Sequence, residues 1–349
     1  MTNFLKKIGL MLLPILAMAS FNLSIDPQML FNKKPLRHVV QELEGRETAE
    51  CYSDFDERVF KKMLLQSPRF QNVDILVLGS SRAMTINGDA FPGKTVLNLA
   101  VSGATLEDLL ALWQLAQERI QYRELIIGLD PWILNPEHGD VRWKSLVADY
   151  NEALKKLQSD SQPATDKSLW RSKIKEIFSP LYFKDSLMAL SKGKASLLGV
   201  RQDGSVIYRS APPPEKETGA PIYKMSPFPK LKKSYKKDLD LWLKLLSKSD
   251  KPVIIWLPPF RPDTYERLES ESDYAMFREA RLFLRTECER FQFTTLGSYN
   301  PSALQLETQD FRDEIHLKPE AVAEQMTEVR EALDQREAEG AVSPPENPL

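Results

Sequence analysis

Four short apolar segments recur along this chain, and they restrict its fold more than any other feature. They cover residues 73–78, 95–99, 124–129 and 253–257. A continuous apolar run of this length, rich in Val, Ile and Leu, is typical of a strand buried on both faces of a sheet. Between the second and third segments, residues 105–120 place apolar side chains at helical spacing after a Thr-x-x-Asp start, which is typical of a capping box. Alternating strands and helices predict an α/β layered domain with a mostly parallel sheet, whose ligands gather at the carboxyl ends of the strands.

Composition agrees with a globular protein and excludes several functional classes. The chain has 349 residues, of which 42% are hydrophobic, so it can bury a large core. Its formal net charge of −2 lacks the basic excess of proteins that bind duplex nucleic acid, and we expect no nucleic-acid partner. The two cysteines, Cys51 and Cys288, are too few for a disulfide scaffold or a cysteine-rich metal site. In an oxidising compartment they could pair, and two separate thiols are the alternative.

The N-terminal segment predicts export of the chain. Lys6 and Lys7 precede an uncharged, largely apolar run over residues 8–25. Counted to its end, this run reaches the length of a membrane-spanning helix, with the lysines on the cytoplasmic side. The small-x-small sequence AMA at residues 17–19 also offers a cleavage signal, so residues 1–25 are either a membrane anchor or a removable signal peptide. The first alternative is a single-pass cell-membrane protein with its domain in the periplasm or at the cell surface, and the second is a secreted protein.

The rest of the sequence divides into four predicted parts. These are a helical lead-in over residues 26–70, the α/β domain over residues 71–335, an insertion within it over residues 142–249, and a disordered tail over residues 336–349. The insertion carries several helical patterns and a candidate hairpin around residues 202–204, so we expect it to be largely helical and to cover one edge of the core. Its basic run KLKKSYKK is either a solvated helix face or a site for an anionic glycan or lipid head group.

Three residues in two distant segments have the chemistry of a nucleophilic serine site. The first predicted strand ends in the turn sequence GSSRA, which presents Ser81 where the sheet opens to solvent. A serine becomes a nucleophile only when a neighbouring base removes its proton and a carboxylate orients that base. Near the end of the domain, Asp313 precedes His316 by three residues, so the carboxylate can hold one ring nitrogen while the other faces the serine. Alternatively, Ser81 caps a helix after the first strand, and His316 bonds Asp313 at a helix start without a catalytic partner.

The sequence does not favour a metal ion. The only candidate cluster combines Asp130 with His138 and Asp140, and its spacing fits a solvated loop as well as a metal site. His138 could line a pocket or lie in an exposed turn, and His38 is assigned no role. We therefore predict neither a metal ion nor a cofactor.

The order of four short motifs resembles that of the SGNH, or GDSL, hydrolase superfamily. The motifs are GSSR after the first predicted strand, VSGA after the second, GLDP at the third, and Asp-x-x-His near the end of the domain. The chain is most similar to the membrane-anchored, cell-envelope branch, which includes the D-alanine transfer protein of teichoic acids and SGNH proteins of exopolysaccharide clusters. The sequences DPQMLF after the N-terminal helix and LPPFRP at the fourth strand also resemble that branch. The resemblance implies a flavodoxin-like three-layer sandwich and covers the core over residues 79–316, but not the insertion.

The resemblance also implies a role for each residue that matches the family motifs. Ser81 matches the nucleophile, and His316 matches the general base. Asp313 matches the residue that orients the histidine. Gly103 matches the backbone donor that stabilises the oxyanion together with the amide of Ser81, because acyl transfer needs donors aimed at the developing negative charge.

The third motif departs from the family pattern. Asp130 stands where the family has an asparagine, and an ionised carboxylate cannot donate a hydrogen bond to an oxyanion. Asp130 must then be protonated, turned away or employed in another role. Arg82 is either a substitute donor to the oxyanion or a surface arginine.

These expectations combine into one principal function and one alternative. The principal function is an exported, membrane-tethered serine esterase or O-acyltransferase that acts on a cell-envelope or extracellular polysaccharide through an acyl-serine intermediate. Water as the acceptor makes it an esterase and a sugar hydroxyl makes it an acyltransferase, with acetyl as the expected acyl group. The alternative is a non-catalytic SGNH-like accessory protein that binds glycan or a partner enzyme in an export complex, and a membrane acyltransferase is a candidate partner.

Overall fold

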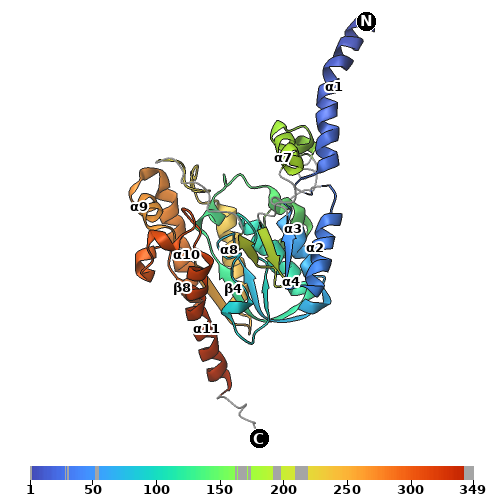
Figure 1. The fold of residues 1–349 in the computed structure, drawn as a ribbon. Helices are drawn as coiled ribbons and strands as arrows, with labels where there is room; N and C mark the ends of the chain where they lie inside the picture. The colour runs from blue at the N-terminus through green and yellow to red at the C-terminus, as the bar shows by residue number, and fades with distance from the viewer. Residues whose placement is uncertain are drawn as a thin grey trace.

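A sheet of five parallel strands forms the centre of the protein in the computed structural model (Figure 1). The structure describes residues 2–27, 29, 31–51, 55–161, 163, 171, 174–191, 198–208 and 219–341. The strands are β2 (Asn72–Leu78), β3 (Val96–Asn98), β4 (Gln121–Gly128), β7 (Val253–Leu257) and β8 (Thr294–Gly297). They lie in the order β3-β2-β4-β7-β8, and every pairing is parallel. Numbered within the sheet, this is the 2-1-3-4-5 order of flavodoxin-like folds. The prediction of an α/β domain with a mostly parallel sheet is confirmed.

Burial explains why four of these strands are visible in the sequence and the fifth is not. In β2, the side chains of Ile75, Leu76 and Val77 have no exposed surface, and the inner parts of β4 and β7 are also buried. The edge strand β8 is only partly buried and begins with two threonines, so it lacks an apolar run. It forms because its register with β7 is set by tertiary packing rather than by its own composition.

Helices surround the sheet, an arrangement consistent with a flavodoxin-like sandwich (Figure 1). Among the described residues, the helices other than α1 (Thr2–Ile25) and α7 (Pro180–Ser191) include α2 (Lys34–Gly45), α3 (Glu57–Leu64), α4 (Leu106–Arg119), α5 (Val147–Lys156), α8 (Lys233–Leu246), α9 (Pro262–Ser270), α10 (Ala275–Arg290) and α11 (Pro319–Ala341). The expected capping box at the start of α4 is confirmed, because the Thr105 hydroxyl accepts from Asp108 N at 3.3 Å and the Asp108 carboxylate accepts from Thr105 N at 3.0 Å. Trp113 of α4 and Trp242 of α8 pack edge to face with ring centroids 6.1 Å apart.

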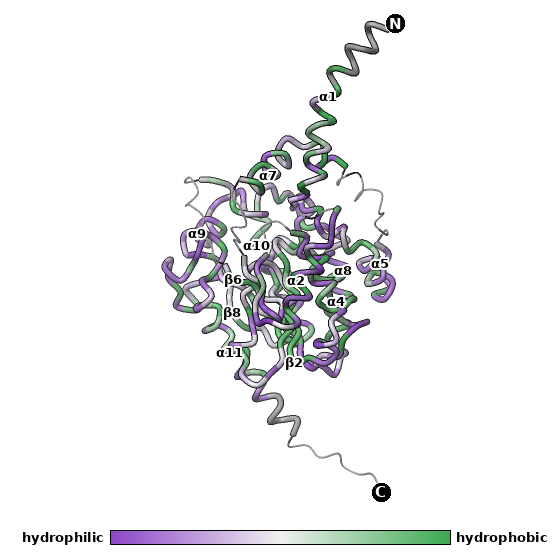
Figure 2. The backbone as a smooth tube through the Cα atoms, turned by 45° about the vertical axis from the view of Figure 1, so that its right-hand side comes forward, coloured by the Kyte–Doolittle hydropathy of each residue, from purple (hydrophilic) through white to green (hydrophobic). Residues whose placement is uncertain are grey.

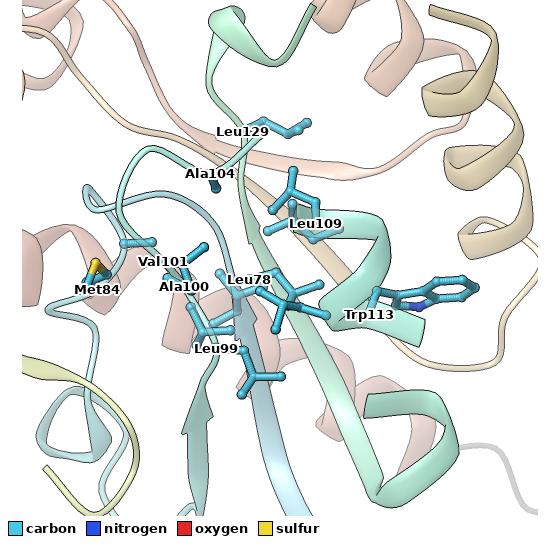
Figure 3. Packing of buried hydrophobic residues seen from close by; sticks show 14 of the residues in the cluster. Leu78, Met84, Leu99, Ala100, Val101, Ala104, Leu109, Trp113 and Leu129 are labelled. Carbon is cyan, nitrogen blue, oxygen red and sulfur yellow. The ribbon is translucent and has the colours of Figure 1, made fainter. Parts of the chain in front are cut away.

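Apolar side chains fill the space below the loops at the carboxyl end of the sheet. Figure 3 shows Leu78, Leu99, Leu109 and Leu129 in this cluster, and all four are buried. The loops that follow β2, β3 and β4 therefore begin from a closely packed base, which limits their movement.

A smaller antiparallel sheet lies outside the central one. Its strands are β1 (Thr48–Cys51), β5 (Leu198–Arg201) and β6 (Val206–Tyr208), in the order β1-β5-β6. Strands β5 and β6 form the hairpin expected around residues 202–204. The prediction of a helical lead-in over residues 26–70 is wrong at β1. This strand pairs with β5 from the distant insertion, and such a contact leaves no local periodicity in the sequence.

The described part of the insertion over residues 142–249 is mostly helical. It contains α5, α7 (Pro180–Ser191) and α8 in addition to the hairpin. In α8, Tyr235 and Leu239 are buried whereas Lys233 and Lys237 are exposed, which agrees with the interpretation of the basic run as a solvated helix face.

Long helices lie at both ends of the chain. The first, α1 (Thr2–Ile25), extends away from the body and meets α7 at its base (Figures 1 and 2). Among the described residues, none of the helices combines the length and the apolar character that a membrane span requires. At the other end, α11 continues to Ala341, so the tail expected from residue 336 is wrong over residues 336–341. This segment, REAEGA, contains the helix formers Ala, Glu and Arg and extends a packed helix. Residues 342–349 lie outside the described part.

Candidate active site

The loop after β2 places Ser81 at the carboxyl end of the central sheet. The chain turns back tightly here, because Ala83 N donates to Ser80 O at 2.9 Å and Met84 N donates to Ser81 O at 3.3 Å. Over residues 79–90, all of which the structure describes, the chain forms turns and one 3-10 helix rather than an α-helix. The alternative in which Ser81 caps an α-helix after the first strand is therefore wrong.

His316 joins Ser81 and Asp313 in a continuous hydrogen-bonded row. Its Nε2 lies 2.8 Å from Ser81 Oγ, and its Nδ1 lies 2.9 and 2.8 Å from the two carboxylate oxygens of Asp313. The serine and the histidine are 235 positions apart, so only the fold brings them together. The side chain of His316 is 21% exposed, so the imidazole is partly accessible to solvent.

The loop that carries His316 also determines the ionisation of Asp313. Asp313 Oδ1 accepts hydrogen bonds from the amides of Ile315 and His316, each at 2.9 Å. Burial raises the pKa of Asp313, but the hydrogen bonds and charge of His316 together with these amides outweigh it and hold the pKa at about 2. Ionised Asp313 favours the tautomer with hydrogen on Nδ1, and Nε2 is then free to accept the proton of Ser81.

The interpretation of Arg82 as a surface arginine is wrong. Its side chain is 1% exposed, and Nη1 donates to Oδ1 of Asp130 at 2.9 Å, which is itself 2% exposed. Burial raises the pKa of Asp130, and the charge of Arg82 opposes that rise. Because a guanidinium stays protonated in proteins, we assign an ion pair rather than two neutral groups. The sequence left three alternatives for Asp130, and the structure supports the third, a role other than oxyanion donor. Asp130 is the counterion of Arg82.

Arg82 also connects three loops of the site. Its Nε donates to Ile315 O at 2.9 Å, directly before His316 in the chain. Its Nη2 donates to Pro258 O at 2.6 Å and to Pro259 O, both in the loop after β7. With these bonds and the ion pair, the guanidinium donors point into the protein, so Arg82 does not fit the role of substitute donor to an oxyanion.

The loop after β3 presents Gly103 and is bonded to the loop after β2, where Val101 N donates to Gly79 O at 3.1 Å. Gly103 has φ +56°, a backbone conformation that favours glycine, and a Cβ added there would require the side chain of Tyr223, whose Oη would lie 2.5 Å away, to move. Within the described part of the chain, the amides of Ser81 and Gly103 donate no hydrogen bond. Neither amide is therefore engaged by another group of the described chain.

Asn98 supports the serine loop and has no role in the predicted site. It ends β3, and its Nδ2 donates to Ala83 O at 2.8 Å and to Ile86 O at 2.7 Å, while its Oδ1 accepts from Ala100 N at 2.8 Å. The sequence signal is an asparagine inside the apolar run TVLNL at the end of a predicted strand, and in the structure this side chain is fully buried. A buried polar side chain at that place must be satisfied by neighbouring backbone, here by the turn after Ser81.

Tyr208 of β6 lies beside the histidine, and no sequence motif indicates it. Its ring centroid is 6.5 Å from that of His316, and the guanidinium carbon of Arg312 lies 4.6 Å from the same tyrosine ring. Burial raises the pKa of Tyr208, so the phenol is neutral near pH 7. The hairpin of the insertion thus forms one wall of the candidate site.

His138 and Asp140 lie in a separate hollow of about 480 Å³, which does not include Asp130. Asp140 Oδ2 accepts from Lys224 Nζ at 3.1 Å and from Arg142 Nη2 at 2.5 Å. Although burial raises the pKa of Asp140, these two cations hold it well below its ordinary value. Burial lowers the pKa of His138 to about 4. The candidate metal cluster is not assembled, and no group of His, Cys, Asp and Glu among the described residues is arranged to hold a metal ion.

His38 and Cys288 lie outside this site. His38 is exposed on α2, where its Nε2 is 3.5 Å from Glu42. Cys288 of α10 is a free, buried thiol, so the pairing with Cys51 is not formed. Burial raises the pKa of Cys288 to about 11, which makes the thiol unreactive near neutral pH.

Neither a protein-family model nor a curated protein matches this chain.

Proposed function

We propose that the protein is an SGNH-type serine acyl-transfer enzyme with Ser81 as its nucleophile. The observation that carries the proposal is the 2.8 Å contact between Ser81 Oγ and His316 Nε2, which continues through Nδ1 to Asp313. Hydroxyl, imidazole and carboxylate in this order activate serine on several unrelated folds. The 2-1-3-4-5 strand order and the sequence order of the four motifs support the SGNH assignment.

In the acylation step, Ser81 Oγ attacks the carbonyl carbon of an ester while its proton moves to His316 Nε2. The carbonyl π electrons move to oxygen and form an oxyanion, and the negative charge of Asp313 stabilises the imidazolium. When the tetrahedral intermediate collapses, the bond to the leaving alkoxide breaks and Nε2 returns its proton to that oxygen. The products of this step are the free alcohol and acyl-Ser81.

The acceptor in the second step distinguishes an esterase from an acyltransferase. His316 Nε2 removes a proton from water or from a sugar hydroxyl, whose oxygen attacks the carbonyl carbon of acyl-Ser81. The second tetrahedral intermediate releases Ser81, which recovers its proton from the imidazolium. The product is a carboxylic acid when water is the acceptor and a new ester when a sugar hydroxyl is the acceptor.

The oxyanion is stabilised by backbone amides in this proposal. The amides of Ser81 and Gly103 are unoccupied within the described chain. Asp130 does not present a bare negative charge to the oxyanion, because Arg82 neutralises it at 2.9 Å. This ion pair weakens the main argument for a non-catalytic protein, although the family's third donor remains absent.

The resemblance to cell-envelope SGNH proteins supports a polysaccharide as the acceptor or the ester substrate, with acetyl as the acyl group. The same resemblance supports a chain tethered to the membrane by α1, with its domain on the extracytoplasmic side. A membrane acyltransferase would supply the acyl group in such a system.

A fluorophosphonate probe tests the proposal directly. The probe forms a phosphonyl ester with an activated serine, so we expect wild-type protein to be labelled at Ser81 and Ser81→Ala to remain unlabelled. Asp313→Asn should label about ten thousandfold more slowly, because it loses the charge that sets the histidine tautomer. Labelling is measured by mass spectrometry of the intact chain and of its peptides.

Ser80→Ala is the matched control, because it removes the neighbouring hydroxyl and leaves the one bonded to His316. It should still be labelled. Absence of labelling in wild-type protein that is folded by circular dichroism would contradict the enzyme and favour the accessory protein. Labelling that survives Ser81→Ala would contradict the assignment of the nucleophile.

A further inference from the structure

Helix α7 and the turn before it expose large apolar side chains. Leu187 and Leu190 are exposed on α7, and Ile174 and Phe178 are exposed on the helical turn that precedes it. Leu187 and Leu190 are three positions apart and Ile174 and Phe178 four, so each pair shares one helix face. Exposed apolar side chains that gather in this way mark an interaction surface rather than the scattered exposure of ordinary surfaces.

Buried polar contacts hold α7 against the end of α1. The side chain of Asn22 has no exposed surface, and its Nδ2 donates to Ile177 O at 2.8 Å. Ser186 Oγ donates to Asn22 Oδ1 at 3.2 Å, and Tyr182 Oη donates to Asp26 Oδ1 at 2.7 Å. Separating the two helices would leave these buried polar groups without partners, which costs free energy. The end of α1 and α7 therefore form one unit.

The apolar surface of this unit continues along α1. Phe21 of α1 contacts Phe183 of α7 with ring centroids 5.3 Å apart, and Phe183 lies four positions before Leu187 on the same helix. Further along α1, away from the body, Leu10 and Leu13 are largely exposed. Figures 1 and 2 show α7 beside the base of α1, where α1 leaves the body. A partner that covers the outer part of α1 would therefore also meet α7.

Cations accompany the exposed apolar residues. Lys175 and Lys184 are exposed and lie three positions before Phe178 and Leu187, respectively. Three positions along a helix place side chains on the same face, so each lysine is adjacent to an apolar side chain. Apolar residues combined with flanking lysine and arginine are typical of helices that lie in the interface of an anionic bilayer, with the cations reaching the head groups.

We propose that α7 and the segment over residues 174–178 rest on an anionic lipid surface where α1 enters the bilayer. The apolar side chains contact the acyl boundary, and Lys175 and Lys184 contact lipid phosphates. The surface would then hold the domain at one orientation to the membrane rather than leaving it to swing on a tether. This inference rests on the tether by α1 in the proposed function, but not on the chemistry of Ser81.

Lipid-attached quenchers test the contact in the full-length chain. An environment-sensitive fluorophore is placed at Leu187→Cys in a Cys51→Ser background, because Cys288 is buried. The chain is reconstituted into phosphatidylcholine vesicles that contain phosphatidylglycerol and doxyl-labelled lipid. We expect blue-shifted emission and quenching at least about twofold stronger than for the same fluorophore at Leu282→Cys, an exposed leucine on α10 of the body.

Both labelled variants keep α1, so equal tethering cannot produce the difference. The double substitution Lys175→Glu with Lys184→Glu should reduce the quenching at Leu187→Cys. Vesicles that contain phosphatidylcholine and doxyl-labelled lipid but no phosphatidylglycerol should also quench this fluorophore less. Quenching at Leu187 no stronger than at Leu282 would overturn the proposal and favour a protein partner or a second copy on this surface. Equal quenching in the two kinds of vesicle would overturn the head-group contact. Fluorophosphonate labelling of the same samples is independent of either result.

Discussion

At the scale of residues, the ion pair of Arg82 and Asp130 explains how the site tolerates a carboxylate where a hydrogen-bond donor is expected. A buried ion pair contributes little net stability, but removal of one partner leaves an uncompensated charge. Arg82 also bonds Ile315 O at 2.9 Å, so the same guanidinium that neutralises Asp130 holds the histidine loop. We therefore regard Arg82 as a positioning residue that acts through His316.

Asp130→Asn should lower the free energy of unfolding by about 3–5 kcal/mol, because it leaves the guanidinium without its counterion. Replacing both partners, Arg82→Met with Asp130→Leu, should recover part of this loss because no buried charge remains. The recovery is partial because the carbonyls of Ile315, Pro258 and Pro259 lose their donor. The double variant should nevertheless react more slowly with fluorophosphonate, because the loop of His316 has lost the hydrogen bond from Arg82 Nε to Ile315 O. Urea unfolding and labelling rates measure the two effects. Wild-type labelling rates in the double variant would show that Arg82 serves stability alone.

At the scale of elements, the β5–β6 hairpin connects the insertion to the central sheet. Asn98 N donates to Asp203 O at 2.7 Å, and Lys61 Nζ donates to Asn98 O at 2.9 Å and to Gly204 O at 2.5 Å. Tyr208 follows on the same hairpin and reaches the ring of His316. The position of this wall of the site therefore depends on the fit of the turn against Asn98.

Gly204→Ala should destabilise the protein more than the control Gly93→Ala. Both glycines have a left-handed φ, +84° and +81°, so both substitutions introduce backbone strain. Only at Gly204 would the new Cβ meet other atoms, at 2.5 Å from Asn98 O, whereas nothing lies within 4 Å at Gly93. We expect a further loss of about 1–3 kcal/mol at Gly204, measured by thermal unfolding. Equal losses would indicate that the turn can move without cost.

At the scale of the whole molecule, the stability should depend on pH through a buried lysine that joins the lead-in, the sheet and the hairpin. Burial lowers the pKa of Lys61 to about 8, against the opposing charges of Glu57 and Asp203. In the unfolded chain the amine keeps its ordinary pKa near 10.5. Between these values the unfolded state binds more protons than the folded state, so this group makes the fold more stable as the pH rises through that window.

The matched comparison is with Lys61→Met, which cannot titrate. The free energy of unfolding of the wild type minus that of the variant should increase by about 1 kcal/mol per pH unit in the middle of the window. Denaturant unfolding at several pH values from about 8 to about 10.5 measures this difference. A difference that stays constant with pH would show that the pKa of Lys61 is unchanged by folding.

Local patterns in the sequence were sufficient to predict much of this architecture. Buried strands such as β2 and the capped helix α4 follow from periodicity and capping, which act over a few residues. The pairing of Asp313 with His316 is also local, because it spans a single short loop. The motif order suggested that Ser81 would meet this pair, and the structure brings the three together.

Other features have no local signal and required the assembled fold. The edge strand β8 and the strand β1 form through pairing with strands far along the chain. The role of Arg82 depends on carbonyl groups of Pro258 and Pro259, which any residue type would provide. Long-range backbone contacts of this kind leave no mark on composition or spacing. The sequence therefore predicts the reactive groups of the site, Ser81, Asp313 and His316. The ion pair of Asp130, the support of the serine loop and the hairpin beside His316 arise only from contacts between distant segments.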